Sequence, residues 1–365
     1  MKKGAVVLLL FILVTWGFTS CDKQSPYLNG VVKVVSMPAT TDTLKGTVVE
    51  LEDIVTGLMA AYDDHLLFFS SKVGDYYIHD YRATDGAKLG AFCRKGGGPD
   101  EVQYLSPSKH VFKDDQRINL WFEVNRKTMK VLHLTTSLAE QRTVFDTVQY
   151  ELDNGKRRGY FYLYFFKHEE GRYLVKNQAV EKSMADIEYE PGAYHLYDSQ
   201  TNERLKTFIL FKKPLINTNN GELFVTKEAY FGSCDALKPD GSKVVMAMLH
   251  MGQLNIMDTK SGEINGYRVK GTPDFDYMKE HVSKLVLYHR YIAVDDENIY
   301  VSYCDQLAGD GRRPLSSHHV HVFTWKGDFV RRIYFEEPFL NMTVDPITHK
   351  LYTYDTYDRV VQYDL

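Results

Sequence analysis

The sequence is poor in several features that mark particular classes of protein. Only 11 of its 365 residues are proline, which argues against a disordered chain. Lysine and arginine number 44 against 48 aspartate and glutamate residues, so the basic excess of a nucleic-acid-binding protein is missing. Long stretches with helical periodicity are almost absent. The exception is residues 274–284, for which we expect a short helix.

Sequence motifs of catalysis are also missing. The G-x-S-x-G pattern of a serine hydrolase and the G-x-x-x-x-G-K-[ST] pattern of a phosphate-binding loop do not occur. No two cysteines stand in a C-x-x-C pair, which excludes the common zinc and redox motifs. Carboxylate pairs for glycoside hydrolysis cannot be assigned, because their separation in space decides that chemistry. The sequence therefore leaves any catalytic residue unassigned, and we expect no cofactor and no metal site.

The N-terminal residues form a targeting segment. Lys2 and Lys3 precede an apolar run at residues 5–14, which is too short to span a bilayer but suits a signal peptide. Residues 18–21 read FTSC and resemble a bacterial lipobox, with Phe18 where leucine is preferred. The resemblance implies a signal peptide at residues 1–20, cleavage before Cys21 and lipidation of its thiol. The alternative is an ordinary secretory signal with an incidental cysteine. We expect residues 21–44 to be the lipidated cysteine and a polar tether.

Three cysteines remain after Cys21, namely Cys93, Cys234 and Cys304. Because three is an odd number, at least one of them has no partner within the chain. We expect buried apolar residues, with a single disulfide as the alternative.

The rest of the chain is rich in aromatic residues, with 26 tyrosines and 20 phenylalanines, as expected of a strand-rich protein. Pairs of short apolar runs, each separated by a polar turn, recur along it: 77–82 with 88–92, 130–134 with 143–145, 194–198 with 205–211, 254–258 with 263–269, 319–324 with 329–335, and 359–364 before the chain end. Two further strand-like runs precede each pair: 57–62 and 66–70, 110–112 and 118–123, 160–166 and 172–177, 229–236 and 243–249, 291–294 and 299–303, and 340–344 and 350–354.

Four strands repeated six times predict an all-β fold, a six-bladed β-propeller with four-stranded antiparallel blades over residues 45–365. The turns are 51 to 65 residues apart, which indicates long loops and a degenerate repeat. The last unit lacks its final strand. We expect residues 47–51 to supply that strand and so to close the ring without a free edge. The competing architecture is a pair of β-sandwiches.

Residues 94–101, RKGGGPDE, form the most specific local motif. With Arg94-Lys95 before it, the Gly98-Pro99-Asp100-Glu101 segment resembles the G-x-G-P-G-E segment of TolB-like six-bladed β-propeller lipoproteins of Bacteroidetes, with Asp100 where that family has glycine. The resemblance implies the fold and the envelope location, since most of the family has no assigned activity. The motif is either a structural turn, in which Glu101 or Asp100 accepts backbone N–H bonds, or part of a ligand site.

Two other segments are candidates for chemistry. His319 and His321 would lie on one face of a strand and could share a metal, but the sequence offers no third ligand. Residues 305–313 offer charged side chains in a long connection that is expected beside residues 94–101. From topology alone, the candidate ligand-binding residues are Arg94, Lys95, Gly98, Glu101, Arg126, His250, Arg312 and Tyr357.

These observations predict a lipid-anchored protein of the bacterial cell envelope, attached to the outer membrane on its periplasmic or its surface side. Loops at the mouth of the propeller channel would bind a small ligand, a glycan or another envelope protein. One alternative is a hydrolase or lyase acting on glycans, which rests only on the range of functions that propellers serve. A further alternative is a structural scaffold in an envelope complex, which would present a large apolar surface patch.

Overall fold

The computed structural model describes residues 23–53, 56–98, 101–114, 116–124, 128–149, 160–167, 171–179, 193–201, 203–212, 232–273, 286–307 and 316–365. The predicted signal peptide, Cys21 and the helix expected at residues 274–284 lie outside this part of the chain. So do Arg126 and Arg312.

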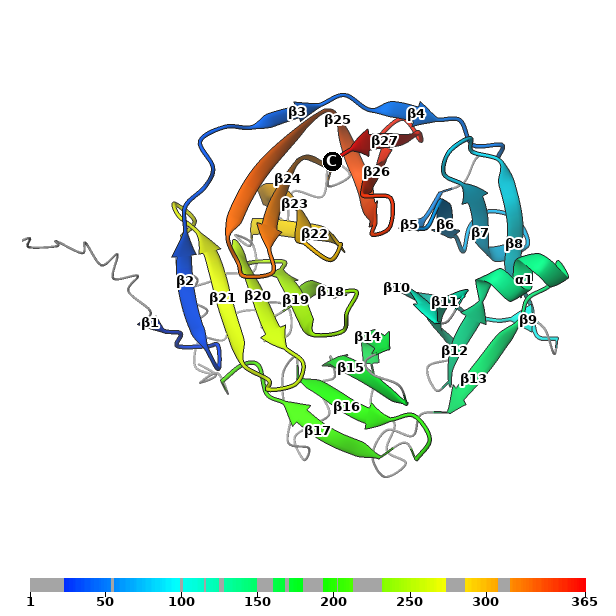
Figure 1. The fold of residues 1–365 in the computed structure, drawn as a ribbon, viewed down its shortest axis with the longest axis horizontal. Coiled ribbons are helices and arrows are strands. Elements are labelled where there is room, and N and C mark those ends of the chain that lie inside the picture. The colour runs from blue at the N-terminus through cyan, green and yellow to red at the C-terminus, as the bar shows by residue number, and fades with distance from the viewer. Residues whose placement is uncertain are drawn as a thin grey trace, which may run out of the picture.

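The described strands form five sheets arranged as a ring around a central axis (Figure 1). Sheets one to three consist of β5 (Leu58–Tyr62), β6 (His65–Phe69), β7 (Tyr76–Arg82), β8 (Lys88–Lys95) and β9 (Glu101–Val102); of β10 (Ser106–Asp114), β11 (Arg117–Val124), β12 (Thr128–His133) and β13 (Phe145–Gln149); and of β14 (Tyr160–Lys167), β15 (Arg172–Ala179), β16 (Tyr194–Asp198) and β17 (Arg204–Phe208). The first strand of each sheet lies nearest the axis (Figure 1).

Sheets four and five also contain strands from the N-terminal segment. Sheet four comprises β18 (Ser233–Leu237), β19 (Lys243–Met248), β20 (Gln253–Asp258), β21 (Ile264–Val269), β2 (Val31–Val35) and β1 (Lys23–Gln24). Sheet five comprises β22 (Val286–Val294), β23 (Asn298–Leu307), β24 (Ser317–Thr324), β25 (Phe329–Asp345), β26 (Lys350–Asp355), β27 (Val360–Asp364), β4 (Thr47–Val49) and β3 (Asp42–Leu44). This propeller-like arrangement confirms the prediction of an all-β fold.

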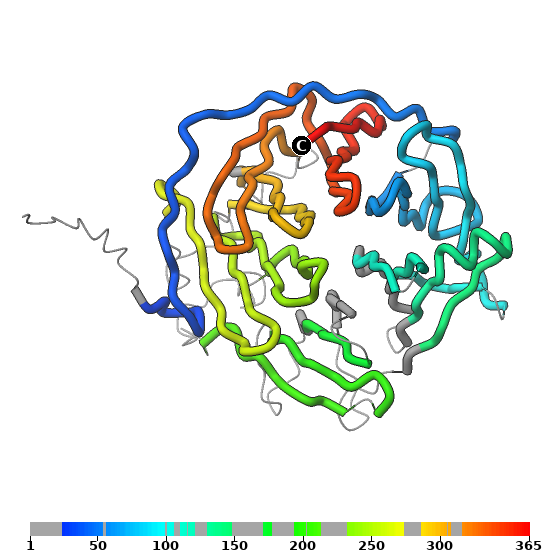
Figure 2. Tube along the Cα trace, viewed as in Figure 1, coloured from blue at the N-terminus to red at the C-terminus, as the bar shows by residue number. Residues whose placement is uncertain are grey.

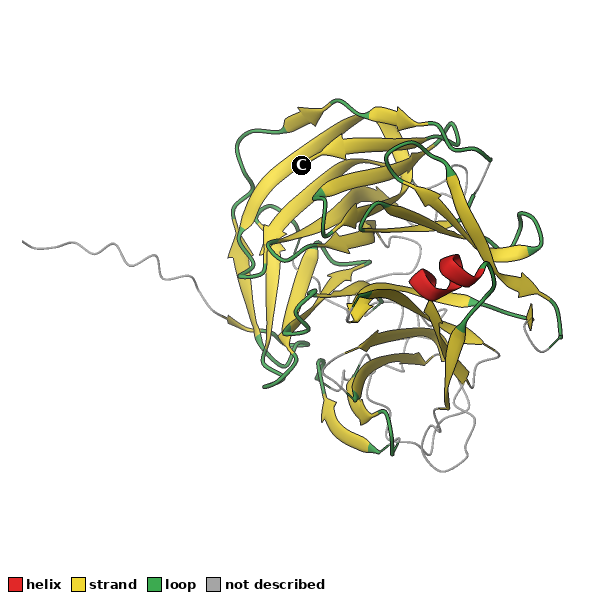
Figure 3. Cartoon of the chain, turned by 45° about the vertical axis from the view of Figure 1, so that its right-hand side comes forward, coloured by secondary structure: helices red, strands yellow, loops and turns green. Residues whose placement is uncertain are grey.

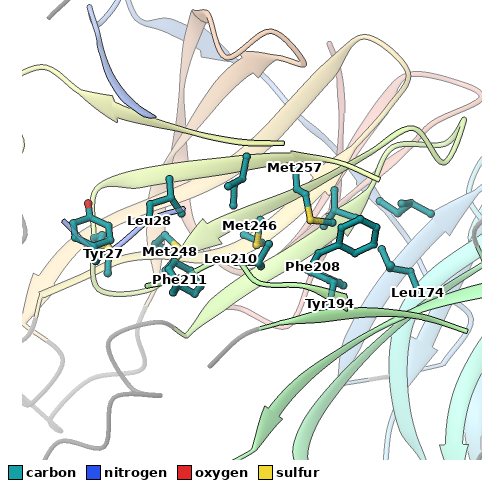
Figure 4. Packing of buried hydrophobic residues seen from close by; sticks show 14 of the residues in the cluster. Tyr27, Leu28, Leu174, Tyr194, Phe208, Leu210, Phe211, Met246, Met248 and Met257 are labelled. Carbon is teal, nitrogen blue, oxygen red and sulfur yellow. The ribbon is translucent and has the colours of Figure 1, made fainter. Parts of the chain in front are cut away.

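The hydrophobic core lies between the faces of neighbouring sheets. Between sheets three and four, Tyr194 and Phe208 pack against Met246 and Met257 (Figure 4). Side chains alternate along each strand, so a strand inside the ring can supply apolar residues to the cores on both of its faces. This need explains runs such as β19, KVVMAM, in which all but the first residue are buried. Full burial of each such aliphatic side chain contributes roughly 1.5–3 kcal/mol.

The prediction of six separate four-stranded sheets is wrong in that form. Residues 329–335 and 340–344, which we expected in different sheets, belong to the single strand β25. Its first half pairs with β24 and its second half with β26, and Phe339 pairs with both. Sheet five therefore has a first unit, β22 to the first half of β25, and a second unit formed by the second half of β25, β26, β27 and β4. Val320 and Ile333 of the first unit pack against Val344 and Leu351 of the second.

The closing strand is confirmed. In β4, Val49 pairs with Val360 and Thr47 with Gln362 of the C-terminal strand β27, in antiparallel register. Main-chain hydrogen bonds near the two ends of the chain thus close the ring, and β27 is left without a free edge.

The prediction of a tether over residues 21–44 is wrong from Lys23 onward. β2 pairs in parallel with β21, and β3 pairs in parallel with the first half of β25. Tyr27 and Leu28 are buried in the core between sheets three and four. The segment follows the outside of the ring from sheet four to sheet one (Figure 2). Residues 31–35, VVKVV, are rich in β-branched side chains, which explains their pairing.

Helix is rare in the described part of the chain (Figure 3). We expected residues 135–137 to be a turn, but they lie in α1 (Leu134–Glu140), a seven-residue helix between β12 and β13. No described helix has the length and apolar composition needed to cross a membrane. Cys93 is buried, Cys234 and Cys304 are partly buried, and none of the three is bonded to another of them.

Candidate functional site

The connections between strands differ greatly in length on the two sides of the ring. Because consecutive strands run antiparallel, their connections alternate between the two sides. We call turn side the side with the connections that follow β5, β18, β20, β22, β24 and β25. We call loop side the side with the connections that follow β6, β8, β15, β17, β19, β21, β23 and β26. The turn-side connections named here have five residues or fewer, and residues 180–193, 209–232 and 270–285 all belong to loop-side connections. The exception on the turn side is the connection between β12 and β13, residues 134–144, which contains α1.

On the loop side, Glu101 holds the glycine-rich loop after β8. Its Oε2 accepts a hydrogen bond from the Gly98 N–H at 2.9 Å, and its own N–H donates to the Gly98 carbonyl at 3.1 Å. Gly96 has φ +157°, and a Cβ there would lie 1.9 Å from the same Oε2. The loop therefore closes around the carboxylate, and only glycine fits at residue 96. This contact supports the structural-turn alternative for the motif.

Lys95 also stabilises the backbone of this region. Its Nζ donates to the carbonyls of Val73 and Gly74 at 3.0 and 2.7 Å, in the connection between β6 and β7. Arg94 lies beside it with 60% of its side chain exposed, and its Nε is 3.8 Å from Glu101 Oε1. An exposed ion pair at that distance contributes little to stability. The Arg94 guanidinium is thus an exposed charged group among the described residues of this loop.

His250 and Tyr357 lie on the same side of the ring but in different environments. The Nδ1–H of His250 donates to the Val286 carbonyl at 3.0 Å, which joins the β19–β20 connection to the start of β22. Burial lowers the pKa of His250, which keeps the imidazole neutral. Tyr357 is 64% exposed, and the Arg359 guanidinium lies 5.0 Å from its ring centre.

The structure thus brings Arg94, Lys95, Gly98 and Glu101 together in one loop. Among the described residues, no hydrogen bond or ion pair connects this loop to His250 or Tyr357. Lys95, Glu101 and His250 use their polar atoms to position backbone, which leaves Arg94 and Tyr357 as accessible side chains.

The paired histidines of β24 lie within sheet five. His321 is 2% exposed and stacks on the ring of Tyr303 at 4.3 Å. Burial is the main cause that lowers the pKa of His321 to about 2 and that of the fully buried His289 to about 4. No group of three or more His, Cys, Asp or Glu side chains that could hold a metal occurs among the described residues.

A second buried polar group, which the sequence did not reveal, lies between sheets three and four. The Lys176 Nζ is 2.7 Å from Asp235 Oδ2 and donates to Ser233 Oγ at 2.6 Å, and neither charged side chain is exposed. Tyr194 donates its O–H to the same carboxylate. Lys176 lies in a run that the sequence presents as an ordinary strand, and its partner is distant along the chain. No local signal could have paired them.

Comparison with known proteins supports the fold without naming an activity. No protein-family model matches the sequence, and a comparison with curated proteins found no match. Among solved structures, the chain is similar to a member of the DUF4221 family from Bacteroides vulgatus, with a TM-score of 0.58 and 13% identity over 89% of this chain and 98% of that chain. It is also similar to a Bacteroides fragilis protein whose name describes expected export, with a TM-score of 0.51 and 11% identity over 91% and 98% of the two chains. At these identities the likeness shows the fold alone, and membership of the TolB-like family is not confirmed.

Proposed function

We propose that this protein is an exported, lipid-anchored binding protein of the bacterial cell envelope, and that it binds a small ligand, a glycan or a protein partner through its loop side. The observation that carries the proposal is the difference between the two sides of the ring. Apart from the α1 connection, the turn-side connections have five residues or fewer, whereas residues 180–193, 209–232 and 270–285 are all loop-side connections. Binding residues are disproportionately found on loops that a rigid scaffold positions.

The proposed anchor is the thiol of Cys21, in the outer membrane, on its periplasmic or its surface side. The expected export named for the Bacteroides fragilis protein of similar fold supports this location. The first strand begins at Lys23, and two residues of extended chain span at most about 7 Å. A lipid on Cys21 would therefore hold the outer edge of sheet four close to the membrane.

We also propose that the two units of sheet five act as separate propeller blades, which gives the ring six blade units, as in the TolB-like family. This proposal is supported by the apolar core between the two units, which pack face to face as neighbouring blades do. Strand β25 would then be the outer strand of one blade and the inner strand of the next.

The test is a binding screen with the purified chain from Lys23 onward against envelope glycans, peptides and the soluble envelope fraction. Arg94→Ala and Tyr357→Ala should each weaken the binding of a captured ligand about tenfold, or about 1.4 kcal/mol. Ile347→Ala is the matched control. Ile347 is 51% exposed, in the same unit as Tyr357 but in a turn-side connection.

If Ile347→Ala weakened binding as much as Arg94→Ala and Tyr357→Ala do, the result would argue against a binding site on the loop side. Turnover of a glycan would instead support the hydrolase or lyase alternative. Binding only to a large envelope complex, unaffected by either loop-side variant, would support the scaffold.

A further inference from the structure

Three nitrogen atoms on one face of sheet five are shielded from solvent and have no hydrogen-bond partner in the described part of the protein. They are Nδ1 of His319, Nδ1 of His321 and Nε of Arg332. A shielded polar atom that lacks a partner costs free energy, and native proteins contain few of them. Three such atoms in one place point to a missing partner.

The strand register places these side chains side by side. His321 of β24 stands directly opposite Arg332 of β25, and His319 stands opposite Tyr334. Residues paired in antiparallel strands point to the same face, and so do residues two apart. Val301 and Phe323 lie on that face too and pack against sheet four. The three nitrogens therefore lie at the interface between sheet four and the first unit of sheet five.

The charge at this place is positive, and no carboxylate of the described residues forms an ion pair with it. Among the described residues, Arg332 forms no ion pair, whereas the adjacent Arg331 points to the opposite face and contacts Asp42 at 2.5 Å. After burial, which is the main cause, the charge of Arg332 also lowers the pKa of both His319 and His321. A guanidinium beside two imidazoles provides N–H donors that match the oxygen atoms of an anion.

The three side chains lie at different depths. His319 and Arg332 are half-buried, and His321 lies deeper, with 2% of its surface exposed. Aromatic rings line the position, since Tyr334 lies 5.2 Å from His319 and Phe329 lies 4.7 Å from His321. These rings reduce competition from water, which strengthens charge-assisted hydrogen bonds.

We infer that His319, His321 and Arg332 form a binding site for a small oxyanion, either a phosphate or a carboxylate group. The Arg332 Nε–H and the Nδ1–H of each histidine donate to the oxygen atoms of the anion. This inference does not depend on the lipid anchor or on the loop-side ligand of the proposed function.

The experiment titrates the purified chain from Lys23 onward with inorganic phosphate, sulfate and acetate at constant ionic strength. Binding is followed by calorimetry and by the ¹⁵N shifts of the histidine rings. We expect saturable binding, a shift of the His321 Nδ1 resonance and at least tenfold weaker binding in Arg332→Gln. Preference for phosphate and sulfate over acetate indicates a phosphate ligand, and the reverse preference indicates a carboxylate.

Arg331→Gln is the matched control, because it removes the same charge from the adjacent residue and the opposite face. It should bind the anion within twofold of the wild type. His318→Asn is the second control, since the Nδ1–H of His318 already donates to the Phe335 carbonyl at 3.0 Å. If Arg332→Gln does not fold, the test compares the changes in the histidine ring ¹⁵N shifts on addition of the anion in the wild type and in Arg332→Lys.

Three results would overturn the inference. One is the absence of saturable binding for all three anions. Another is that the added anions stabilise Arg332→Gln against unfolding as much as they stabilise the wild type, because salts that are excluded from the protein surface have this general effect without a binding site. The third is a crystal structure grown in phosphate in which only ordered water contacts the three nitrogens.

Discussion

Replacement of Asp345 by alanine should open the junction between the second unit of sheet five and sheet one. The carboxylate is fully buried at the turn between β25 and β26. It accepts N–H bonds from Ile347 at 2.9 Å and Thr348 at 3.4 Å in its own turn. It also accepts N–H bonds from Asp63 at 3.0 Å and Asp64 at 3.1 Å, in the turn between β5 and β6. One side chain thus joins the turns of two neighbouring sheets.

The structure sets the size of the effect. Four backbone hydrogen bonds at a net value of about 1 kcal/mol each give a loss of about 4 kcal/mol in the free energy of unfolding. An unfolding entropy of about 2.1 cal/mol/K per residue then gives a fall in Tm of about 5 °C for a chain of this size. Urea unfolding followed by fluorescence measures the first quantity, and calorimetry measures the second.

Amide hydrogen exchange shows whether the loss of stability crosses the junction into sheet one or stays within the second unit of sheet five. In Asp345→Ala, faster amide exchange should spread from β26 into β5 and β6. The control is Asp355→Ala, because Asp355 is equally buried but accepts N–H bonds only within its own turn, from Tyr357 and Arg359. Its effect should stay within β26 and β27. A loss below about 1 kcal/mol, or exchange in β5 and β6 equal to that of the control, would refute the reasoning.

Three further predictions concern buried charges and the chain ends. Lys176→Met and Asp235→Leu should each cost about 3–5 kcal/mol, and the double variant much less than their sum, because one buried charge alone is worse than none; additive losses in urea unfolding would contradict this. A chain that starts at Lys45 exposes the edges of β21 and β25, and one that starts at Glu50 exposes the edge of β27 as well, so self-association measured by light scattering should be stronger in the second. Finally, the pKa values of about 4 for His289 and about 2 for His321 lie below the value of about 6.5 for a histidine in the unfolded chain. The stability that the two neutral histidines contribute is therefore fully present above about pH 6.5, and the free energy of unfolding falls by about 2–3 kcal/mol per pH unit between about pH 6 and about pH 4.5. In urea unfolding, His289→Asn and His321→Asn should each make this pH dependence less steep.

The strands were predictable because apolar runs end at residues, such as glycine, whose backbone conformations favour tight turns. The φ of Gly262 is +83° and that of Gly327 is +89°, as required in the tight turns expected at both positions. The continuity of β25 was not predictable in the same way. Residues 336–338, Glu-Glu-Pro, indicate a linker, yet they stay extended. Proline is tolerated at residue 338 because the strand changes partners at Phe339, so no ladder bond needs its missing N–H.

The pairing of the N-terminal segment is a contact between distant parts of the sequence. β2 adds in parallel to β21 and β3 adds in parallel to β25, and parallel pairing leaves no hairpin turn to signal it. The polar residues between these strands indicated a tether. The five residues VVKVV of β2 were the local signal against that interpretation, since two-sided apolar character is uncommon in a solvated linker.

Three of the candidate residues chosen by loop position also have a structural role. Lys95, Glu101 and His250 each use their polar atoms to fix a connection, as a degenerate repeat with long loops requires. The proposed oxyanion site lies on a strand face, and a sequence also predicts which residues of two hairpin strands lie opposite each other. His321 stands five residues before Lys326, and Arg332 stands five residues after Gly327, so a simple hairpin around that turn pairs the two side chains. In a propeller of this kind, hairpin register is thus a better guide to converging polar groups than membership of a loop.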